Sequence, residues 1–508
     1  MADRRDRRQP RVVREVERKV ALPRGVALPV MVGTVPGVVA IRAMASVVLA
    51  AAYHDTEDRR LAASGVSLRR REGGPDAGWH LKIPAPYGEA GRDEVRLPLD
   101  AAPAGTVPAA LAQIVVPLVR EAALLHLASV RTERSGWELL DADGEVLAEV
   151  VDDDVATEPG RVQHRQVEVE ARVTDRRADE VLTGVVALLV EAGGTAETLT
   201  KSAMALGEVE VTGPVTVPPV PRPKDPAVDL LRHTLATGVR ALLLADLDVR
   251  RDVPDAVHRM RVAARTLRSD LRTFAPLVAG DGSTALRDEL RVTAGALGAA
   301  RDLEVQLDRL LTCAARLPEP AASQTARAVG AGRVPRREAA VGAAMETLCT
   351  ERHVVLLVDL VEAASSLHPS PLAAGSIVDV VPPLLDGAMR RLQRAVGRLD
   401  LDGPAVAWHR ARVLAKRARY AADAAGTVLH QARRLAAGLA ELTDRLGQAH
   451  DAAVALGVLE GLAQEADGPT GYALGLLASR QQKSERKARR AALAAWSKVE
   501  KASRHLHA

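Results

Sequence analysis

The sequence predicts the α+β fold class, with an antiparallel β-barrel tunnel and flanking helices followed by an all-α duplicated helical bundle with pseudo-two-fold symmetry. Three observations support this prediction. Apolar and charged residues alternate with a period of two before residue 212 and with a helical period after residue 226. Six prolines lie between these two parts. A basic motif with helical spacing occurs twice in the second part.

Changes of composition along the 508 residues predict two folded domains with a stiff connection. Residues 1–11 are expected to form a disordered basic tail, residues 12–212 the β-rich domain and residues 227–508 the helical domain. The stretch 213–226 is rich in proline, which is typical of an extended linker. A chain of this length buries enough apolar surface for separate cores.

Composition also narrows the classes of partner and compartment. Aromatic residues make up only 2% of the chain, which argues against the aromatic stacking that binds single-stranded nucleic acid. The formal net charge is only +4, so clustered cations rather than total charge indicate a polyanionic partner. Two cysteines give no disulfide framework, and no segment has the pattern of a signal sequence or membrane span. We therefore expect a cytoplasmic protein that does not bind a membrane.

The strands of the first domain carry charged residues on one face and apolar residues on the other. In the first strand, Glu15, Glu17 and Lys19 alternate with Val16 and Val20. Later strands repeat this pattern at Arg69 and Arg71, at His80 and Lys82, and at Glu168, Glu170 and Arg172. Two architectures fit, a sheet with one face in water or a barrel with a polar lumen. Helices predicted at 104–119 and 179–192 would cover the apolar outside, and Asp143-Gly144 predicts a hairpin turn.

Five ordered blocks of this domain resemble the CYTH domain, a triphosphate tunnel metalloenzyme fold. The segment EVERK, which contains Glu15, Glu17 and Lys19, resembles the ExExK signature of that family. The segments YHDTEDRRLAASGVSLRRR, GWHLKIP, WELLDADGEVLAEVVDD and VEVEARV follow in the family's order. Glu133 is a departure, because the resembling block tends to be basic at that position.

The resemblance implies metal-dependent hydrolysis of a triphosphate inside a tunnel. Arginine and lysine would bind the phosphates, and carboxylates would hold Mg²⁺ or Mn²⁺, because hard cations prefer oxygen ligands. The implied catalytic residues are Glu15, Glu17 and Lys19. The implied metal or water ligands are Glu15, Glu17, Glu149, Asp152, Glu168 and Glu170. The implied phosphate-binding residues are Lys19, Arg69, Arg71, Lys82, and Arg131 or Arg134.

Two basic ridges of equal spacing stand out in the helical domain. The first ridge occupies an arc of roughly 80° on one helix and is interrupted by a single acid, Asp270. It consists of His258, Arg261, Arg265, Arg268 and Arg272. The second ridge lies 151 residues downstream and consists of His409, Arg412, Lys416 and Arg419. The later segments LGAARD and LGQAHD also correspond, so the sequence predicts a duplication in which both ridges line one cavity.

Other parts of the helical domain carry less specific predictions. Arg259, Arg410 and Arg417 lie off the ridges and are expected to face solvent. Asp302 and Asp451 are expected to orient basic residues or to cap helices. The helical period predicts helices near 227–246, 255–277, 284–316, 336–365, 376–397, 404–427, 430–463 and 471–499.

The repeated motifs, HxxRxxxR and HxxRxxxK with LGAARD and LGQAHD, resemble the CHAD domain, a conserved-histidine α-helical domain often found behind CYTH. The resemblance implies a pseudo-two-fold bundle whose central basic pore binds inorganic polyphosphate. The two ridges and Arg301 would be the binding residues. Because no carboxylate cluster and no paired base and nucleophile lie near the ridges, we interpret them as a binding site rather than a catalytic one.

These observations lead to one leading hypothesis and two alternatives. The leading hypothesis is a metal-dependent triphosphatase joined to a polyphosphate-binding module, with association to polyphosphate granules as a further expectation. The second is a non-catalytic protein that binds polyphosphate, or is targeted to its granules, through the helical domain and has a vestigial tunnel. The third is a nucleic-acid binder, which the scarcity of aromatic residues and the absence of a recognisable nucleic-acid motif disfavour.

Overall fold

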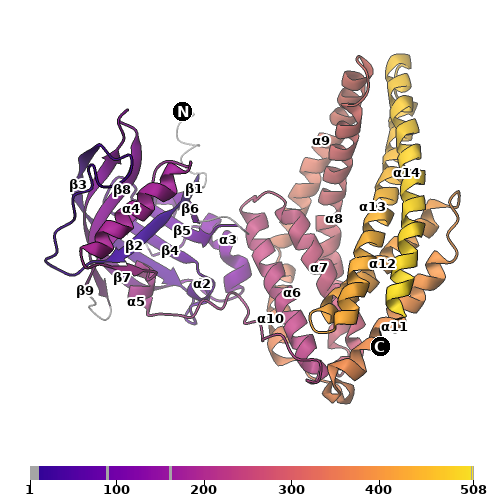
Figure 1. The fold of residues 1–508 in the computed structure, drawn as a ribbon, viewed down its shortest axis with the longest axis horizontal. Coiled ribbons are helices and arrows are strands. Elements are labelled where there is room, and N and C mark those ends of the chain that lie inside the picture. Colours follow the sequence, from indigo (N-terminus) through magenta and orange to yellow (C-terminus); the bar gives the residue numbers. More distant parts are fainter. Residues whose placement is uncertain (1–10, 87–90, 104, 159–162, 505, 507–508) are drawn as a thin grey trace. The chain divides into compact units, whose positions relative to one another are not determined.

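The computed structural model describes residues 11–86, 91–103, 105–158, 163–504 and 506. All of the predicted basic tail except Arg11 therefore lies outside the described residues. The chain folds into two units, the first ending at Pro214 and the second beginning at Val215 (Figure 1). Val215 packs against the helical core, so this part of the proline-rich stretch belongs to the second unit.

The first unit is built on one antiparallel sheet. Within the described residues its order is β1-β6-β5-β4-β3-β7-β8-β9-β2-β10. The strands are β1 (Arg11–Glu15), β2 (Glu17–Ala21), β3 (Ala40–Asp55), β4 (Ser67–Glu72), β5 (Gly78–Pro84), β6 (Arg92–Leu97), β7 (Leu125–Leu140), β8 (Val146–Glu158), β9 (Gln163–Ala171) and β10 (Thr195–Glu197). The helices are α2 (Arg60–Ala63), α3 (Ala109–Val119), α4 (Arg177–Glu191) and α5 (Lys201–Leu206).

The sheet curls as predicted for a tunnel, and its hydrogen-bond ladder stays open among the described residues. The reason lies in the first strand, which is divided between two neighbours. β1 pairs with β6 at one edge of the sheet, whereas β2 pairs with β9 and β10 at the other. Only Val16 separates β1 from β2, so the chain itself brings the two ends of the sheet together.

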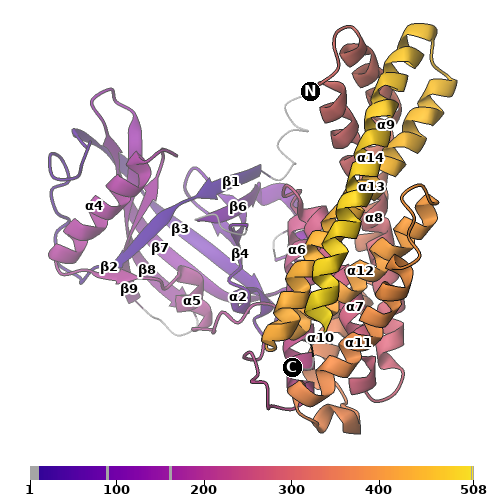
Figure 2. The ribbon, with the colours of Figure 1, turned by 45° about the vertical axis from the view of Figure 1, so that its right-hand side comes forward.

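The charged face of the strands turns toward the inside of this curl, as the polar-lumen alternative predicts. On the outside, Val20, Val167 and Val169 form one apolar core with side chains of α4. The apolar stripe of α4 consists of Val181, Leu182, Val185 and Leu189. α4 crosses the outer face of the strands in Figure 2, where it was predicted, whereas α3 begins only at Ala109, after Pro108.

The second unit consists of helices in two corresponding series. Their bounds are α6 (Ala227–Arg250), α7 (Ala256–Thr273), α8 (Gly282–Ala314), α9 (Ala321–Leu348), α10 (Glu351–Ser366), α11 (Ile377–Val396), α12 (Ala405–Gly426), α13 (His430–Gln464) and α14 (Gly468–Ser503). Between the series, α6 packs against α11, α7 against α12, α8 against α13 and α9 against α14. Each of these eight helices contacts its own counterpart, which is the arrangement expected of a duplicated bundle, whereas α10 packs against α6, α8 and α9.

One predicted helix is wrong. The segment expected as a single helix at 336–365 contains the end of α9 and the beginning of α10. The break falls at Cys349 and Thr350, where the Thr350 side chain accepts a hydrogen bond from the His353 backbone and caps the new helix. The helical period continues across this break, and the residue that indicates a new helix start is the capping Thr350.

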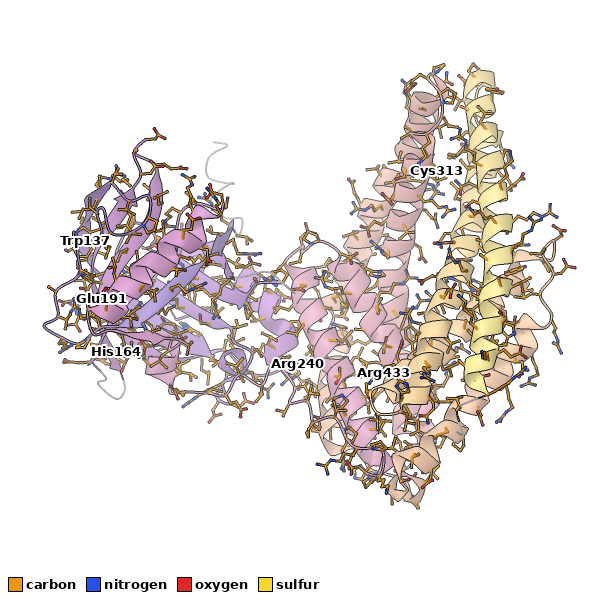
Figure 3. All side chains as sticks on the ribbon, viewed as in Figure 1. Trp137, His164, Glu191, Arg240, Cys313 and Arg433 are labelled. Atoms are coloured by element: carbon orange, nitrogen blue, oxygen red, sulfur yellow. The ribbon has the colours of Figure 1, made fainter. Side chains whose placement is uncertain are left out.

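Side chains fill the spaces between the helices (Figure 3). The main core combines residues of both series, including Leu267, Phe274 and Leu439. A separate apolar cluster joins the far ends of the long hairpins, where Leu310 of α8 and Leu459 of α13 meet Leu477 of α14. Among the described residues, no helix combines the length and the apolar character that crossing a bilayer needs.

Candidate functional site

The inside of the curled sheet encloses a cavity of about 530 Å³, which we call the sheet cavity. Charged side chains of both signs line it. Its basic residues are Lys19, Arg69, Arg71, Lys82, Arg92, Arg96, Arg134, Arg172 and Lys201. Its acidic residues are Glu15, Glu17, Asp76, Glu94, Glu149, Glu168 and Glu170.

Three of the carboxylates form a row across adjacent strands. The ladder register places Glu149 of β8 opposite Glu170 of β9, and Glu170 opposite Glu17 of β2. Directly opposed residues share one face of a sheet, with Cβ atoms about 4.5–5.5 Å apart, and like charges at such positions repel. Burial, together with the charges of Glu15 and Glu149, raises the pKa of Glu170 to about 7. Arg172 pairs with Glu149 and, at 3.0 Å, with Glu170, so the negative charge of the row is already partly neutralised.

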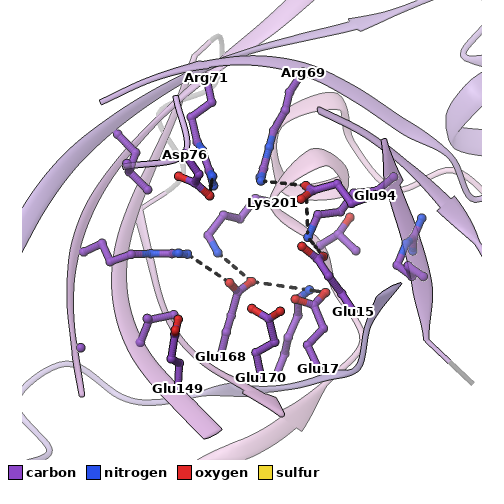
Figure 4. A pocket seen from close by; sticks show the side chains of 18 of the residues that line it. Glu15, Glu17, Arg69, Arg71, Asp76, Glu94, Glu149, Glu168, Glu170 and Lys201 are labelled. Carbon is purple, nitrogen blue, oxygen red and sulfur yellow. Dashed lines mark hydrogen bonds and ion pairs between the residues drawn. The ribbon is translucent and has the colours of Figure 1, made fainter. Parts of the chain in front are cut away.

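Arginines from β4 lie on the opposite side of the cavity. Figure 4 shows Arg69 and Arg71 facing the carboxylates of Glu17, Glu149 and Glu170. Burial and the charges of Arg69 and Arg134 lower the pKa of Arg71 to about 9. The Nε atoms of Arg69 and Arg71 have no hydrogen-bond acceptor in the described part of the chain. The guanidinium groups of Arg69 and Arg71 line the cavity, and such groups suit phosphate oxygens.

Glu94 organises several of these cations, and the sequence analysis did not identify it. Its side chain is fully buried on β6 and lies 3.0 Å from His80 Nδ1, 3.6 Å from Arg69 Nη2 and 3.8 Å from Lys82 Nζ. Burial would raise the pKa of Glu94, but His80, Lys82 and Arg69 hold it well below its usual range. A single carboxylate therefore fixes cations from two neighbouring strands.

Glu168 has a similar role on the opposite wall. Its carboxylate lies 2.7 Å from Lys201 Nζ, 3.2 Å from Arg134 Nη2 and 3.5 Å from Lys19 Nζ. Burial would raise the pKa of Glu168, but Lys201, Lys19 and Arg134 hold it well below its usual range. Lys201 was also missed, because it stands at the first position of the short helix α5 rather than in a strand with alternating charges.

Two predicted site residues lie outside the cavity. Asp152 binds Arg165 on the outer face, with Arg165 Nε and Nη2 donating to its two oxygens at 2.9 and 2.7 Å. Asp153 is the inward neighbour instead: it is fully buried and pairs with Arg134 and Lys201, each at 2.7 Å. Strand periodicity is the reason, because Glu149 and Asp152 are three residues apart and so face opposite sides.

Arg131 is the second residue that was placed wrongly. Its side chain is 61% exposed on β7 and pairs with Glu133, which is 67% exposed. Arg134 is the arginine of this strand that reaches the cavity. Because Glu133 also lies on the outer face, its departure from the basic character of the resembling block does not affect the cavity.

The remaining predicted residues of the first unit do line the sheet cavity. Glu17 pairs with Lys19, and Glu15 pairs with Lys82 and with Arg96, the latter at 2.8 Å. In the part of the chain that the structure describes, no group of three His, Cys, Asp or Glu side chains is close enough to hold a metal ion. The donor chemistry of the carboxylate row still fits a hard divalent cation, because it offers only oxygen and carries mutual repulsion that such an ion relieves.

A second candidate site, which we call the basic groove, lies between α7 and α12 in the helical unit. Its volume is about 50 Å³. Its lining residues are Arg265, Arg268, Ser269, Arg272, Arg412, Val413, Lys416, Arg417 and Tyr420. The structure thus brings members of both basic ridges together, as predicted for one shared cavity. Arg417 also lines the groove, so the expectation that it is simply solvated is wrong.

No carboxylate belongs to this lining in the described structure, and the cations perturb one another. Burial first, and then the charges of Arg412, Arg265 and Arg261, lowers the pKa of Lys416 to about 7. Burial and the neighbouring Arg261 also lower the pKa of Arg265. Ser269 Oγ and Arg412 Nε are buried without a hydrogen-bond partner among the described residues. The basic groove therefore offers positive charge and unpaired hydrogen-bond donors to an anion with several oxygen acceptors.

The other predicted binding residues of this unit do not line the groove. Arg261 Nη1 donates to Asp302 at 2.7 Å, so Asp302 orients a basic residue as expected. Arg301 lies 2.9 Å from Glu304 and 3.3 Å from Asp255, and its charge lowers the pKa of His258, after burial.

In the second series, His409, His450 and Arg419 make other contacts. The rings of His409 and His450 approach to 4.8 Å between centroids. Arg419 Nη1 lies 3.3 Å from Thr443 Oγ1, and its Nε lies 3.5 Å from Asp423. Arg419 therefore points away from the groove that Arg412 and Lys416 share.

Comparisons with known proteins identify both units. The family model described as the CYTH domain matches residues 13–201, and that described as the CHAD domain matches residues 233–460. Two proteins of Mycobacterium tuberculosis span the combination: the uncharacterized proteins MT2285, from strain CDC 1551 / Oshkosh, and Rv2226, from strain ATCC 25618 / H37Rv. Each is 34% identical over 436 residues, which cover 81% of this chain and 82% of the relative.

Several solved structures resemble parts of the chain. PptA from Streptomyces chartreusis is 25% identical and matches 54% of this chain and 100% of its own, with a TM-score of 0.47. The CHAD domain from the plant Ricinus communis is 25% identical and matches 54% of this chain and 94% of its own, with a TM-score of 0.44. The putative adenylyl cyclase HpAC1 from Hippeastrum, reported to have a dominant triphosphatase activity, is 16% identical and matches 37% and 94%, with a TM-score of 0.25.

Proposed function

Because the chain belongs to the family of proteins that join a CYTH domain to a CHAD domain, we propose that it hydrolyses a triphosphate and binds inorganic polyphosphate. Hydrolysis takes place in the sheet cavity and depends on Mg²⁺ or Mn²⁺. The substrate is inorganic tripolyphosphate or an organic triphosphate. The basic groove binds the polymer without altering it.

One observation carries the catalytic part of this proposal. A single cavity of about 530 Å³ holds arginines on one wall and a row of carboxylates on the opposite wall. A triphosphate needs positive charge along its length and, at the reacting phosphoryl group, a means to neutralise developing charge. The cavity supplies cations for the phosphates and carboxylate oxygens for a metal ion within one enclosure.

Each group of side chains has a definite task in this proposal. Arg69, Arg71 and Lys82 bind phosphate oxygens, and Glu94 keeps Arg69 and Lys82 in place. Glu17, Glu149 and Glu170 hold the metal ion, which when bound polarises the phosphoryl group and activates water. Glu168 fixes Lys19, Arg134 and Lys201, so it positions cations rather than binding the metal. Glu15 lies at the junction, paired with both Lys82 and Arg96.

The binding part rests on the composition of the basic groove. Arg265, Arg268 and Arg272 come from α7, and Arg412, Lys416 and Arg417 come from α12. Without a carboxylate in this lining, the groove offers no carboxylate ligand to a hard metal ion. A linear polyanion would satisfy several of these cations at once and release their counterions.

The catalytic proposal is tested by measuring phosphate release from tripolyphosphate, ATP and long-chain polyphosphate, with Mg²⁺, with Mn²⁺ and with chelator. We expect metal-dependent release by the wild type and its loss in Glu17→Gln. The matched control is Glu133→Gln, which removes an exposed carboxylate from the outer face and should retain full activity. If wild type and Glu17→Gln are equally inert on every substrate, the protein does not hydrolyse triphosphates.

That outcome would leave the alternative of a polyphosphate-binding protein with an inactive cavity. The observation in its favour is that Glu15, Glu17 and Glu168 are already paired with lysine or arginine. Binding of long-chain polyphosphate to the full chain separates the two functions, because it depends on the basic groove. Retained binding together with absent hydrolysis would support the alternative.

A further inference from the structure

The two basic ridges differ in the basic side chain that each places in the groove. Lys416 of the second ridge lies 151 residues after Arg265 of the first ridge and corresponds to it. Both side chains line the basic groove, Arg265 from α7 and Lys416 from α12. A guanidinium group has a much higher ordinary pKa than an amine, so the amine is the group that loses its proton first when both are buried among cations.

Most of the charged groups that act on Lys416 are basic. α7 contributes Arg261 and Arg265, α12 contributes Arg412, and the acid that acts on Lys416 is Asp451 of α13. His258 of α7 also feels the charge of Lys416. The charges of Arg391 on α11 and Arg287 on α8 act on two other arginines of the groove, Arg272 and Arg417. The acids that act on this group of cations are Asp451, on Lys416 and Arg412, and Asp302 of α8, on Arg265 and Arg412.

Such a site favours release of a proton from its only amine. Moving the charged amine out of water and next to Arg412 and Arg265 is unfavourable, and the pKa of Lys416 is lowered to about 7. A polyphosphate chain in the groove reverses the sign of the local field. Its oxygens stabilise the ammonium form and accept hydrogen bonds from it, so the bound state binds the proton more tightly than the free state.

We propose that Lys416 is a proton-coupled binding residue, neutral in the empty groove in mildly alkaline solution, which takes up one proton when a polyanion binds. This inference rests on the proposed polyphosphate binding and adds its regulation. The groove would then hold the polymer most tightly near neutral pH and release it as pH rises. Arg265, at the corresponding position, supplies the part of the affinity that does not depend on pH.

The sign of the effect follows from linkage. In a free protein with the lowered pKa, Lys416 is charged below pH 7 and neutral above it, whereas in the complex it stays charged to higher pH. Uptake of one proton makes the association constant fall by about tenfold for each pH unit above neutrality, until the bound lysine itself loses its proton. The arginines of the groove keep their charge over this range.

The experiment uses the full chain, long-chain inorganic polyphosphate and titration calorimetry at pH 8.5 in two buffers of different ionisation enthalpy. For the wild type we expect uptake of about one proton per site and affinity that falls by about tenfold per pH unit between pH 7.5 and 9.5. In Lys416→Arg the charge is permanent, so proton uptake is lost and affinity becomes nearly independent of pH. In Lys416→Gln the affinity is also independent of pH, but it is as low as that of the alkaline wild type.

Two outcomes overturn the proposal. Equal proton uptake by wild type and Lys416→Arg would assign the proton to another group. Binding of polyphosphate with no proton uptake would contradict the inference while leaving the proposed function intact, whereas absence of binding at every pH would contradict the proposed function itself.

The protonation of Lys416 can also be measured without long-chain polyphosphate. The pH dependence of acetic anhydride labelling of Lys416, followed by peptide mass spectrometry, reports the free amine directly. We expect a midpoint near neutrality in the free protein and a shift to higher pH when inorganic tripolyphosphate is added. A midpoint near that of an exposed lysine, about 10.4, would refute the proposal.

Discussion

The sheet cavity and the basic groove both gather arginine and lysine, but only the cavity combines them with carboxylates. In the cavity, Glu94 and Glu168 fix the cations from behind, while Glu17, Glu149 and Glu170 form a separate row. In the groove, the cations face one another without a carboxylate among the lining residues. The difference teaches that a mixed site can hold a metal beside a phosphate, whereas a purely basic site can only hold the anion.

The largest effect is expected at the arginines of the cavity that we propose to bind phosphate. Arg69→Ala removes a buried cation that faces the carboxylate row, and we expect kcat/KM for tripolyphosphate to fall on the order of 10²–10³-fold. Arg70→Ala is the matched control, because Arg70 belongs to the same strand but pairs with Glu72 and does not line the cavity. Steady-state phosphate release checks both variants. Equal losses in the two would show that the cavity is not the site of hydrolysis.

A variant of the basic groove should lose polymer binding and keep hydrolysis. Arg412→Ala removes one charge-assisted contact, so we expect long-chain polyphosphate to bind roughly 10–100-fold more weakly. The salt dependence of the affinity should also become shallower, by about 0.7 in the logarithmic slope for each lost contact. Hydrolysis of tripolyphosphate should not change.

Arg410→Ala serves as the control for the groove, since Arg410 is exposed and absent from its lining. Fluorescence anisotropy with labelled polyphosphate at several salt concentrations measures both variants. A comparable loss of affinity in the control would mean that net charge, not the groove, binds the polymer.

The carboxylate row predicts a conflict between stability and function. The raised pKa means that folded Glu170 keeps its proton up to about pH 7, so the protein loses stability as pH rises from the usual range of a glutamate through that value. Glu170→Gln removes this cost and should stabilise the protein by roughly 1–3 kcal/mol at pH 8, after allowance for partial solvent screening, but not at pH 4.

The same variant should lose metal-dependent hydrolysis, because a neutral amide is a weaker ligand for a hard cation. Calorimetric unfolding of the full chain at both pH values, beside phosphate release, gives the two readings. Glu133→Gln, on the exposed outer face, should change neither. A destabilised Glu170→Gln at pH 8 would contradict the assignment of mutual repulsion in the row.

The smallest effect is expected where the sequence prediction was wrong. Asp152→Ala removes a carboxylate that pairs with Arg165 and does not line the cavity, so phosphate release should stay within about twofold of wild type. Asp153→Asn tests the inward neighbour, which holds Arg134 and Lys201, and should reduce activity much more. The reverse order of effects would mean that Asp152 contributes to the site.

Much of the site could be predicted because the relevant signal is local. The alternation at Glu15, Glu17 and Lys19 fixes which side chains share a face of a strand, and the spacing of Arg265, Arg268 and Arg272 fixes a face of a helix. The same rule also shows that Glu149 and Asp152 cannot both point into one cavity. That error came from applying the family resemblance without the period of the strand.

Glu94 and Lys201 could not be found in this way. Glu94 follows Asp93 in a short charged strand, and Lys201 begins a helix of six residues, so neither has a pattern that distinguishes it from a solvated residue. Each becomes recognisable only when the fold places it beside cations from other elements. Arg417 is a comparable case, since its position off the ridge predicts exposure whereas it is half-buried and lines the groove.

The sequence by itself determined the two units, their fold classes, the duplication of the helical part and the side of each strand or helix on which charge lies. These properties follow from periods of two and of about 3.6 residues, which are set by local backbone geometry. The tertiary structure decided which charged faces meet: the register of β2, β8 and β9 aligned the carboxylates, and the contact of α7 with α12 joined the ridges. Strand register and helix contacts depend on packing between distant segments, which no local period specifies.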